Sequence, residues 1–158
     1  MIAFSRKSLW AVSLVLLATS IAGAAQPIVF VTLAQGNHSG ITTFAQLVVR
    51  SPDEWAALWR RHAAGTKIPP GLPAVDFSRN MVIAVFFGEG PAGRRTAISA
   101  IVERDGELVV FLQMVGPPGP ESDDLPQITP FHIVQLARSP MPVIFIPAKI
   151  PDLYQPSR

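Results

Sequence analysis

Met81-Val82-Ile83-Ala84-Val85-Phe86-Phe87 is the stretch of sequence that decides the fold. All of these side chains are apolar, and no polar residue interrupts them. A strand that buries only one face alternates apolar with polar side chains, whereas a continuous apolar run indicates a central strand covered on both faces. We therefore expect residues 81–87 to form the middle of a sheet.

Two antiparallel strands are expected after this run. Residues 96–104 fit either a helical face or a strand by the spacing of their apolar side chains. Asp105-Gly106 followed directly by an apolar segment over residues 107–115 is a strong hairpin signal. We therefore predict a hairpin rather than a helix.

Four more strands are expected along the chain. Residues 41–50 are rich in β-branched residues and alternate, so that one face carries Ile41, Thr43, Ala45, Leu47 and Val49. Apolar segments predict the other three at residues 28–33, 131–137 and 142–146. Pro142 and Pro147 bracket the last of these, which places it at a sheet edge.

One amphipathic helix is predicted to begin at Ser51-Pro52-Asp53-Glu54. Ser51 suits the N-cap, Pro52 suits the first helical turn, and Glu54 completes a capping box. The apolar stripe of the helix is formed by Trp55, Leu58, Trp59 and His62, at i, i+3, i+4 and i+7. We expect Gly65 to end the helix, and the proline-rich residues 69–73 to prevent it from restarting.

These elements predict an α+β domain: a mostly antiparallel sheet of about six strands with one amphipathic helix packed against it. The chain has 158 residues, 49% of them hydrophobic and 15% charged, which suits one domain and excludes a disordered chain. It has 16 Pro and 11 Gly, which favour short elements separated by turns. It contains no Cys, which excludes a disulfide scaffold and thiol chemistry.

Residues 1–24 have the layout of a secretory signal peptide. Arg6 and Lys7 form a positive region, residues 9–21 carry no charge, and Ala22-Gly23-Ala24 offers small residues for cleavage. We therefore expect a periplasmic or secreted protein with one domain over residues 25–158, which meets the membrane only during export. No Cys follows the apolar run, so we expect no lipid anchor.

The charge of the mature chain gives no signal for nucleic acid. The whole chain is formally +2, but removing Arg6 and Lys7 leaves eleven basic and eleven acidic residues. The remaining Lys and Arg form no long stripe. We therefore expect no nucleic-acid partner.

A search for catalytic and metal-binding patterns assigns no catalytic, cofactor-binding or metal-ligating residue. His38, His62 and His132 lack the i, i+4 spacing that places two imidazoles on one metal. We expect His62 to be a hydrogen-bonded residue at the margin of the core. Glu121, Asp123 and Asp124 lie in a proline-rich loop, and their spacing matches no calcium-binding loop.

Gly88-Glu89-Gly90-Pro91-Ala92-Gly93 matches the Gly-x-Gly-x-x-Gly pattern of dinucleotide-binding turns and follows a predicted strand. Against that interpretation, Pro91 has no N–H to offer a phosphate, and a strand rather than a helix is expected next. A small-molecule, nucleotide or anion binder that uses residues 88–95 remains the alternative hypothesis. Contact between an anion or an acidic peptide and the pair Arg94 and Arg95 is an intermediate hypothesis.

Several segments together resemble the C-terminal domain of the protease complex subunit PrcB family. They are Trp55-Ala56-Ala57-Leu58-Trp59, then Pro73-Ala74-Val75-Asp76-Phe77 before the central strand, the turn with Gly88, Pro91 and Gly93, and Thr129-Pro130-Phe131-His132-Ile133-Val134. The resemblance extends from about residue 40 to residue 145. Where the family's turn typically reads Pro-Thr-Gly-Gly-Tyr, this chain has Pro91-Ala92-Gly93-Arg94-Arg95.

The resemblance implies an exported accessory subunit, without chemistry of its own, that binds and stabilises an extracytoplasmic protein such as a protease. We therefore expect a protein partner, no cofactor and no enzymatic activity. Loops often carry binding groups, so two are candidate contact surfaces: the turn over residues 88–95 and the loop over residues 116–127. The candidate partner-binding residues are Gly88, Pro91, Gly93, Arg94 and Arg95.

Overall fold

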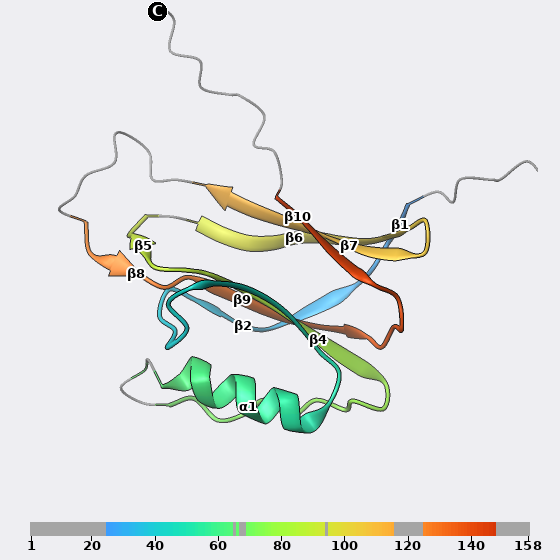
Figure 1. Cartoon of the computed structure of the whole chain (residues 1–158), viewed down its shortest axis with the longest axis horizontal. Helices are drawn as coiled ribbons and strands as arrows, with labels where there is room; N and C mark the ends of the chain where they lie inside the picture. The colour runs from blue at the N-terminus through green and yellow to red at the C-terminus, as the bar shows by residue number, and fades with distance from the viewer. Residues whose placement is uncertain (1–24, 65, 67–68, 94, 116–124, 148–158) are drawn as a thin grey trace, which may run out of the picture.

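The fold has three layers, two four-stranded β-sheets and one helix, in a computed structural model that describes residues 25–64, 66, 69–93, 95–115 and 125–147 (Figure 1). Sheet A has the strand order β1 (Gln26–Pro27), β6 (Arg95–Arg104), β7 (Glu107–Val115), β10 (Val143–Pro147). Sheet B has the order β2 (Phe30–Gly36), β9 (Phe131–Ala137), β4 (Asn80–Phe87), β3 (Phe44–Val49). Helix α1 (Pro52–Ala63) covers the face of sheet B that is turned away from sheet A (Figure 1).

Strand β4 is the central strand that its sequence predicts. Residues 81–86 are all 0% exposed, and β4 lies between β9 and β3 in sheet B. Its side chains point alternately into two cores. Val82, Ala84 and Phe86 pack in the core beneath α1, whereas Met81, Ile83 and Val85 pack in the core between the sheets. An apolar residue at every position is therefore required, because both faces of this strand are buried.

The helix begins as predicted. Ser51 is the N-cap, its Oγ accepts a hydrogen bond from the N–H of Glu54 at 3.4 Å, and Pro52 is the first helical residue. Glu54 Oε2 in turn accepts from the N–H of Arg50 at 3.0 Å. The predicted stripe of Trp55, Leu58, Trp59 and His62 is buried against sheet B. The predicted end at Gly65 lies outside the described residues, and the helix as described ends at Ala63.

The predicted hairpin is confirmed. β6 pairs antiparallel with β7, and the turn residues Asp105 and Gly106 have φ of 54° and 80°. Positive φ at both central residues is the geometry of the two-residue hairpin turn that Asp-Gly favours.

The α+β class is confirmed, and the described part of the chain contains one helix and ten strands rather than about six. The three strands that no predicted segment covers, β1 and the pair β5 (Gly90–Pro91) and β8 (Gln127–Ile128), have only two residues each. The predicted 28–33 strand lies two residues later, at Phe30–Gly36, and the predicted 41–50 strand is shorter, at Phe44–Val49. Strands of two residues, such as β1, β5 and β8, cannot be predicted from an alternation of apolar and polar side chains.

Strand β10 lies at the edge of sheet A, as its flanking prolines predict. It pairs in parallel with β7, and this is the exception among otherwise antiparallel pairs of the described strands. The chain reaches this position by leaving sheet A after β7, adding β9 to sheet B, and then returning. Among the described residues, no helix combines the length and the apolar character that a membrane crossing requires.

Candidate functional site

The predicted glycine-rich turn packs closely against two other connections. Gly88 has φ of 78°, and a Cβ added to it would lie 3.2 Å from the backbone N of Phe44. Glu89 donates its N–H to the carbonyl of Thr42 at 2.9 Å. Gly88 is therefore needed for a close approach between two backbones.

The second half of this turn pairs with the segment before β9. Pro91 lies in β5 opposite Gln127 of β8, and Ala92 donates its N–H to the carbonyl of Pro126 at 2.8 Å. Gly93 has φ of 91°. The next element is strand β6 rather than a helix, so these glycines do not lead into the helix N-terminus that a dinucleotide-binding turn uses.

The candidate arginines of this turn are only partly described. Arg94 lies outside the described residues, and Arg95 is described only as the first backbone position of β6, opposite Val115. Residues 116–124 of the other candidate loop also lie outside the described residues, together with Glu121, Asp123 and Asp124. The contact role of these two surfaces remains a prediction.

His62 lies fully in the core rather than at its margin. Its ring packs against Phe131, with centroids 4.2 Å apart, and against Trp59 at 5.0 Å. Its Nδ1 lies 3.0 Å from the hydroxyl of Ser39, which also accepts the N–H of Ile41. Burial lowers the pKa of His62, which favours the neutral ring.

The pair Ser39 and His62 is a contact that the sequence does not reveal. A hydroxyl within hydrogen-bond distance of an imidazole is also half of a nucleophile–base arrangement, but such a pair needs access to a substrate. Both side chains are buried, and Ser39 is also bound to Thr129, whose Oγ1 accepts its N–H at 2.6 Å. The geometry assigns the pair to structure: it fastens the turn before β3 onto α1.

His132 joins the two sheets. Its Nδ1 accepts the backbone N–H of Ile98 in β6 at 2.9 Å, which leaves that nitrogen without a proton. Its Nε2 lies 2.9 Å from Oγ1 of Thr32 in β2 and carries the remaining proton. Burial lowers the pKa of His132, which favours this neutral form. Among the described residues, no three His, Asp or Glu side chains are placed to hold a metal ion.

One side of the sandwich of sheets A and B leaves its core partly uncovered. The opposite side is closed by the chain itself, because β1 leads directly into β2 and Ile28 donates its N–H to the carbonyl of Ile101 in β6. The edge strands β3 and β10 have no such connection. Between and beside them lie Phe44, Val48, Phe87, Met141, Val143 and Phe145, which we call the open side.

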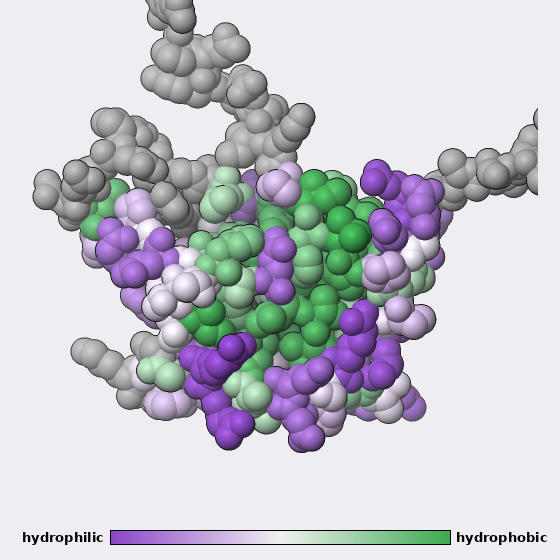
Figure 2. Space-filling view, in the orientation of Figure 1, coloured by the Kyte–Doolittle hydropathy of each residue, from purple (hydrophilic) through white to green (hydrophobic). Residues whose placement is uncertain are grey.

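Hydrophobic residues gather in the middle of this face of the molecule and hydrophilic residues surround them (Figure 2). Phe44 is the most exposed member of the open side, at 57%, and the other five are partly buried. Large contiguous apolar patches on soluble proteins are a common feature of interaction sites.

A groove lined by three arginines adjoins the open side. It has a volume of 880 Å³ and is lined by Val48, Arg50, Ser78, Arg79, Arg138, Ser139, Pro140, Met141, Pro142 and Val143. Val48, Met141 and Val143 belong to both the groove and the open side. We call it the arginine groove; the sequence did not predict it.

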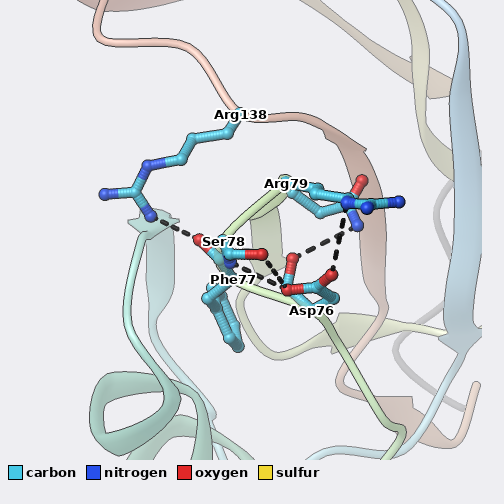
Figure 3. A network of polar contacts seen from close by, with 6 residues as sticks. Asp76, Phe77, Ser78, Arg79 and Arg138 are labelled. Atoms are coloured by element: carbon cyan, nitrogen blue, oxygen red, sulfur yellow. Dashed lines mark hydrogen bonds and ion pairs between the residues drawn. The ribbon is translucent and has the colours of Figure 1, made fainter.

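Main-chain carbonyls hold two of these arginines in place. Arg50 donates to the carbonyl oxygens of Ser139 at 3.3 Å and Met141 at 3.0 Å. Arg138 donates through Nη1 to the carbonyl of Phe77 at 2.6 Å (Figure 3). The same Nη1 donates to the carbonyl of Arg50 at 3.1 Å. Carbonyl oxygens orient a guanidinium without neutralising its charge. Both groups therefore remain positive and fixed at the wall of the groove.

The third arginine has a weak partner. Arg79 Nε lies 3.9 Å from Asp76 Oδ2, and the side chain of Arg79 is 85% exposed (Figure 3). Asp76 Oδ1 accepts hydrogen bonds from the hydroxyl and the N–H of Ser78, and these hydrogen bonds lower the pKa of Asp76. An exposed ion pair of this length neutralises little of the local charge.

Comparisons of the chain with protein-family models, with curated proteins and with solved structures found no match.

Proposed function

We propose that the chain is an exported, non-enzymatic binding domain, an accessory subunit that holds and stabilises an extracytoplasmic protein such as a protease. The proposal agrees with the resemblance to the PrcB C-terminal domain and with the layout of residues 1–24. The observation that carries it is the open side, an apolar surface between two strand edges that pair with no other described strand.

The open side has the features of a surface that accepts another polypeptide. Edge strands β3 and β10 offer free main-chain groups with which an extended segment can pair, and apolar side chains lie between them. Aromatic residues such as Phe44, Phe87 and Phe145 are common in the central part of protein interfaces. Enclosing this surface in a complex removes apolar area from water and stabilises both proteins.

Capture from a cell-envelope extract tests the proposal, with residues 25–158 immobilised and retained proteins measured by mass spectrometry. Phe44→Glu should abolish retention of the partner, because it places a charge on the most exposed side chain of the apolar surface. Val31→Glu is the matched control, because Val31 is 61% exposed on β2 at the closed side. The proposal requires a protein that the wild type and Val31→Glu both retain and that Phe44→Glu loses. If the extract contains no such protein, the proposed function is wrong.

The accessory role needs a second measurement on the captured partner. A stabilising subunit slows thermal inactivation of its partner, because binding to the folded form lowers the population that unfolds. We expect the wild-type chain and Val31→Glu to extend the half-life of the purified partner at elevated temperature, and Phe44→Glu to leave it unchanged.

A further inference from the structure

The arginine groove continues the open side at its end near β10. Val48, Met141 and Val143 are shared by the two surfaces, so a polypeptide that lies on the open side reaches the arginines without leaving the protein surface. The lining is of two kinds: Val48, Met141 and Val143 are apolar and shared with the open side, and three arginines supply positive charge. A ligand that fills both parts must be apolar at one end and carry an anion at the other.

The charge of the groove is positive. Three guanidinium groups line it, and no Asp or Glu is among its lining residues. Three described acids lie beside the groove: Asp76 pairs weakly with Arg79, and Glu54 accepts from the N–H of Arg50. The third, Glu103, lines a neighbouring pocket that shares Arg138 and Met141 with the groove. Anions are therefore attracted to this end of the open side and cations are repelled.

The fixed arginines keep donors available for a ligand. Arg50 uses Nε and one N–H of Nη2 on carbonyls, and Arg138 uses Nη1, so the other nitrogens of both guanidinium groups make no hydrogen bond to a described residue. In Figure 3 the remaining nitrogens of Arg138 point away from the carbonyl of Phe77. A guanidinium that is already oriented loses little conformational entropy when it binds a planar carboxylate through two hydrogen bonds.

We propose that the arginine groove binds the C-terminal carboxylate of an extended peptide whose last side chain is apolar. The carboxylate lies on Arg50 and Arg138, the last side chain contacts Met141 and Val143, and the preceding residues follow the free edge of β10. The inference rests on the proposed function and names the segment of the partner that this end of the surface holds. An internal acidic side chain or an inorganic anion would leave the apolar wall unused, which is why a chain terminus fits better.

A pair of peptide pools tests the proposal. Both pools have four random positions followed by Ala, Val, Leu or Phe, one ending in the free acid and the other in the amide. Retention on the immobilised chain is measured by mass spectrometry. We expect the free acids to be retained about tenfold better than the amides, because a charge-assisted, bidentate contact is lost in the amide.

Arg79→Glu is the variant of choice, because Arg79 is exposed and its side chain makes no hydrogen bond or ion pair with a described residue other than the weak pair with Asp76. It should reduce retention of the free acids about tenfold through charge reversal. Arg104→Glu is the matched control, since Arg104 is also exposed and also pairs with a neighbouring acid, Asp105, at 3.6 Å, but it does not line the groove. It should leave retention unchanged.

The outcomes separate this inference from the proposed function. Equal retention of acids and amides, or retention that Arg79→Glu leaves unchanged, overturns the groove as a carboxylate site. If a captured partner is then still lost on Phe44→Glu, the binding function stands and the groove has no part in it. If inorganic phosphate protects the chain in a thermal melt while no peptide is retained, the site is one for a free anion and the inference is wrong.

Discussion

Two buried histidines each connect parts of the fold that are distant in sequence. His132 links β9 to β6 and to β2, and His62 links α1 to the turn that contains Ser39. Every buried side-chain nitrogen and oxygen of the described residues has a hydrogen-bond partner. Protonating either ring adds a charge that its surroundings do not compensate, because no described acid contacts either imidazole.

These histidines make stability depend on pH. Burial lowers the pKa of both in the folded chain, while in the unfolded chain each titrates at about 6.5. The unfolded state therefore takes up protons first, so stability is fully present above pH 6.5 and is lost as the pH falls towards the folded pKa. We expect the free energy of unfolding in urea to be constant from pH 8 to 7 and then to fall by up to about 1.4 kcal/mol per pH unit for each histidine.

His132→Gln should roughly halve that slope, because one of the two titrating groups is removed while an amide oxygen can still accept the N–H of Ile98. His38→Gln is the control, since His38 is exposed and should leave the slope as it is in the wild type. The measurement stays above pH 5.5, where Glu54 and Asp76, whose pKa values are lowered, remain ionised. A slope that is unchanged in His132→Gln would contradict the assignment of a neutral ring.

At this scale, the sequence predicts residues whose role is local. Ser51 as N-cap and the burial of Trp55 and Trp59 follow from spacing along one helix. The hydrogen-bond partners of the two histidines cannot be predicted from local spacing. Ser39 is 23 residues from His62, and Thr32 is 100 residues from His132. Such pairs depend on the register of strands that no local pattern specifies.

The hairpin of β6 and β7 depends on a turn with two left-handed residues. Gly106 has φ of 80°, and a Cβ added there would meet no atom within 4 Å. We expect Gly106→Ala to lower the free energy of unfolding by about 1–2 kcal/mol through backbone strain alone. Urea denaturation of the variant and the wild type at pH 7.5 measures this loss of stability.

Gly71→Ala is the matched control for this substitution. A Cβ on Gly71 also meets nothing within 4 Å, and its φ lies outside the positive region. That variant should be as stable as the wild type or slightly more so, because alanine restricts the unfolded chain. Equal losses at the two positions would show that strain in the turn is not the cause.

Among the elements, those with a strong local signal were predicted closely, namely α1, β4, β9 and the hairpin. β1, β5 and β8 were missed because two residues carry no periodicity. The parallel pairing of β10 with β7 was also missed, since the sequence of an edge strand shows its exposure but not the direction of its neighbour.

The molecule as a whole is held together by β4, which contributes side chains to both cores. Beyond the predicted leader, the chain's only tryptophans are Trp55 and Trp59 on α1, so fluorescence of the mature chain reports the helix layer. Ile83 lies in the other core, between the sheets. We expect Ile83→Val to lower stability by about 0.5–1.5 kcal/mol and to shift the fluorescence and circular dichroism transitions together. Transitions that separate would show that the layers unfold independently.

The arginine groove exists only at the scale of the whole molecule, which explains why the sequence did not predict it. Arg50 lies between β3 and α1, Arg79 lies just before β4, and Arg138 follows β9. Each is an ordinary surface arginine in its own segment. They meet because the ends of β3, β4 and β9 lie together in sheet B, and that depends on strand order.

The strand order of sheet B also governs when the newly made polypeptide can fold. β9 is inserted between β2 and β4, so β2 has no neighbour in its sheet until Phe131–Ala137 has been synthesised, and sheet A is completed later still by β10. Pairings this distant in sequence form slowly. A nascent chain therefore cannot complete its hydrophobic cores early. It remains incompletely folded until β10, the last strand described, has been synthesised.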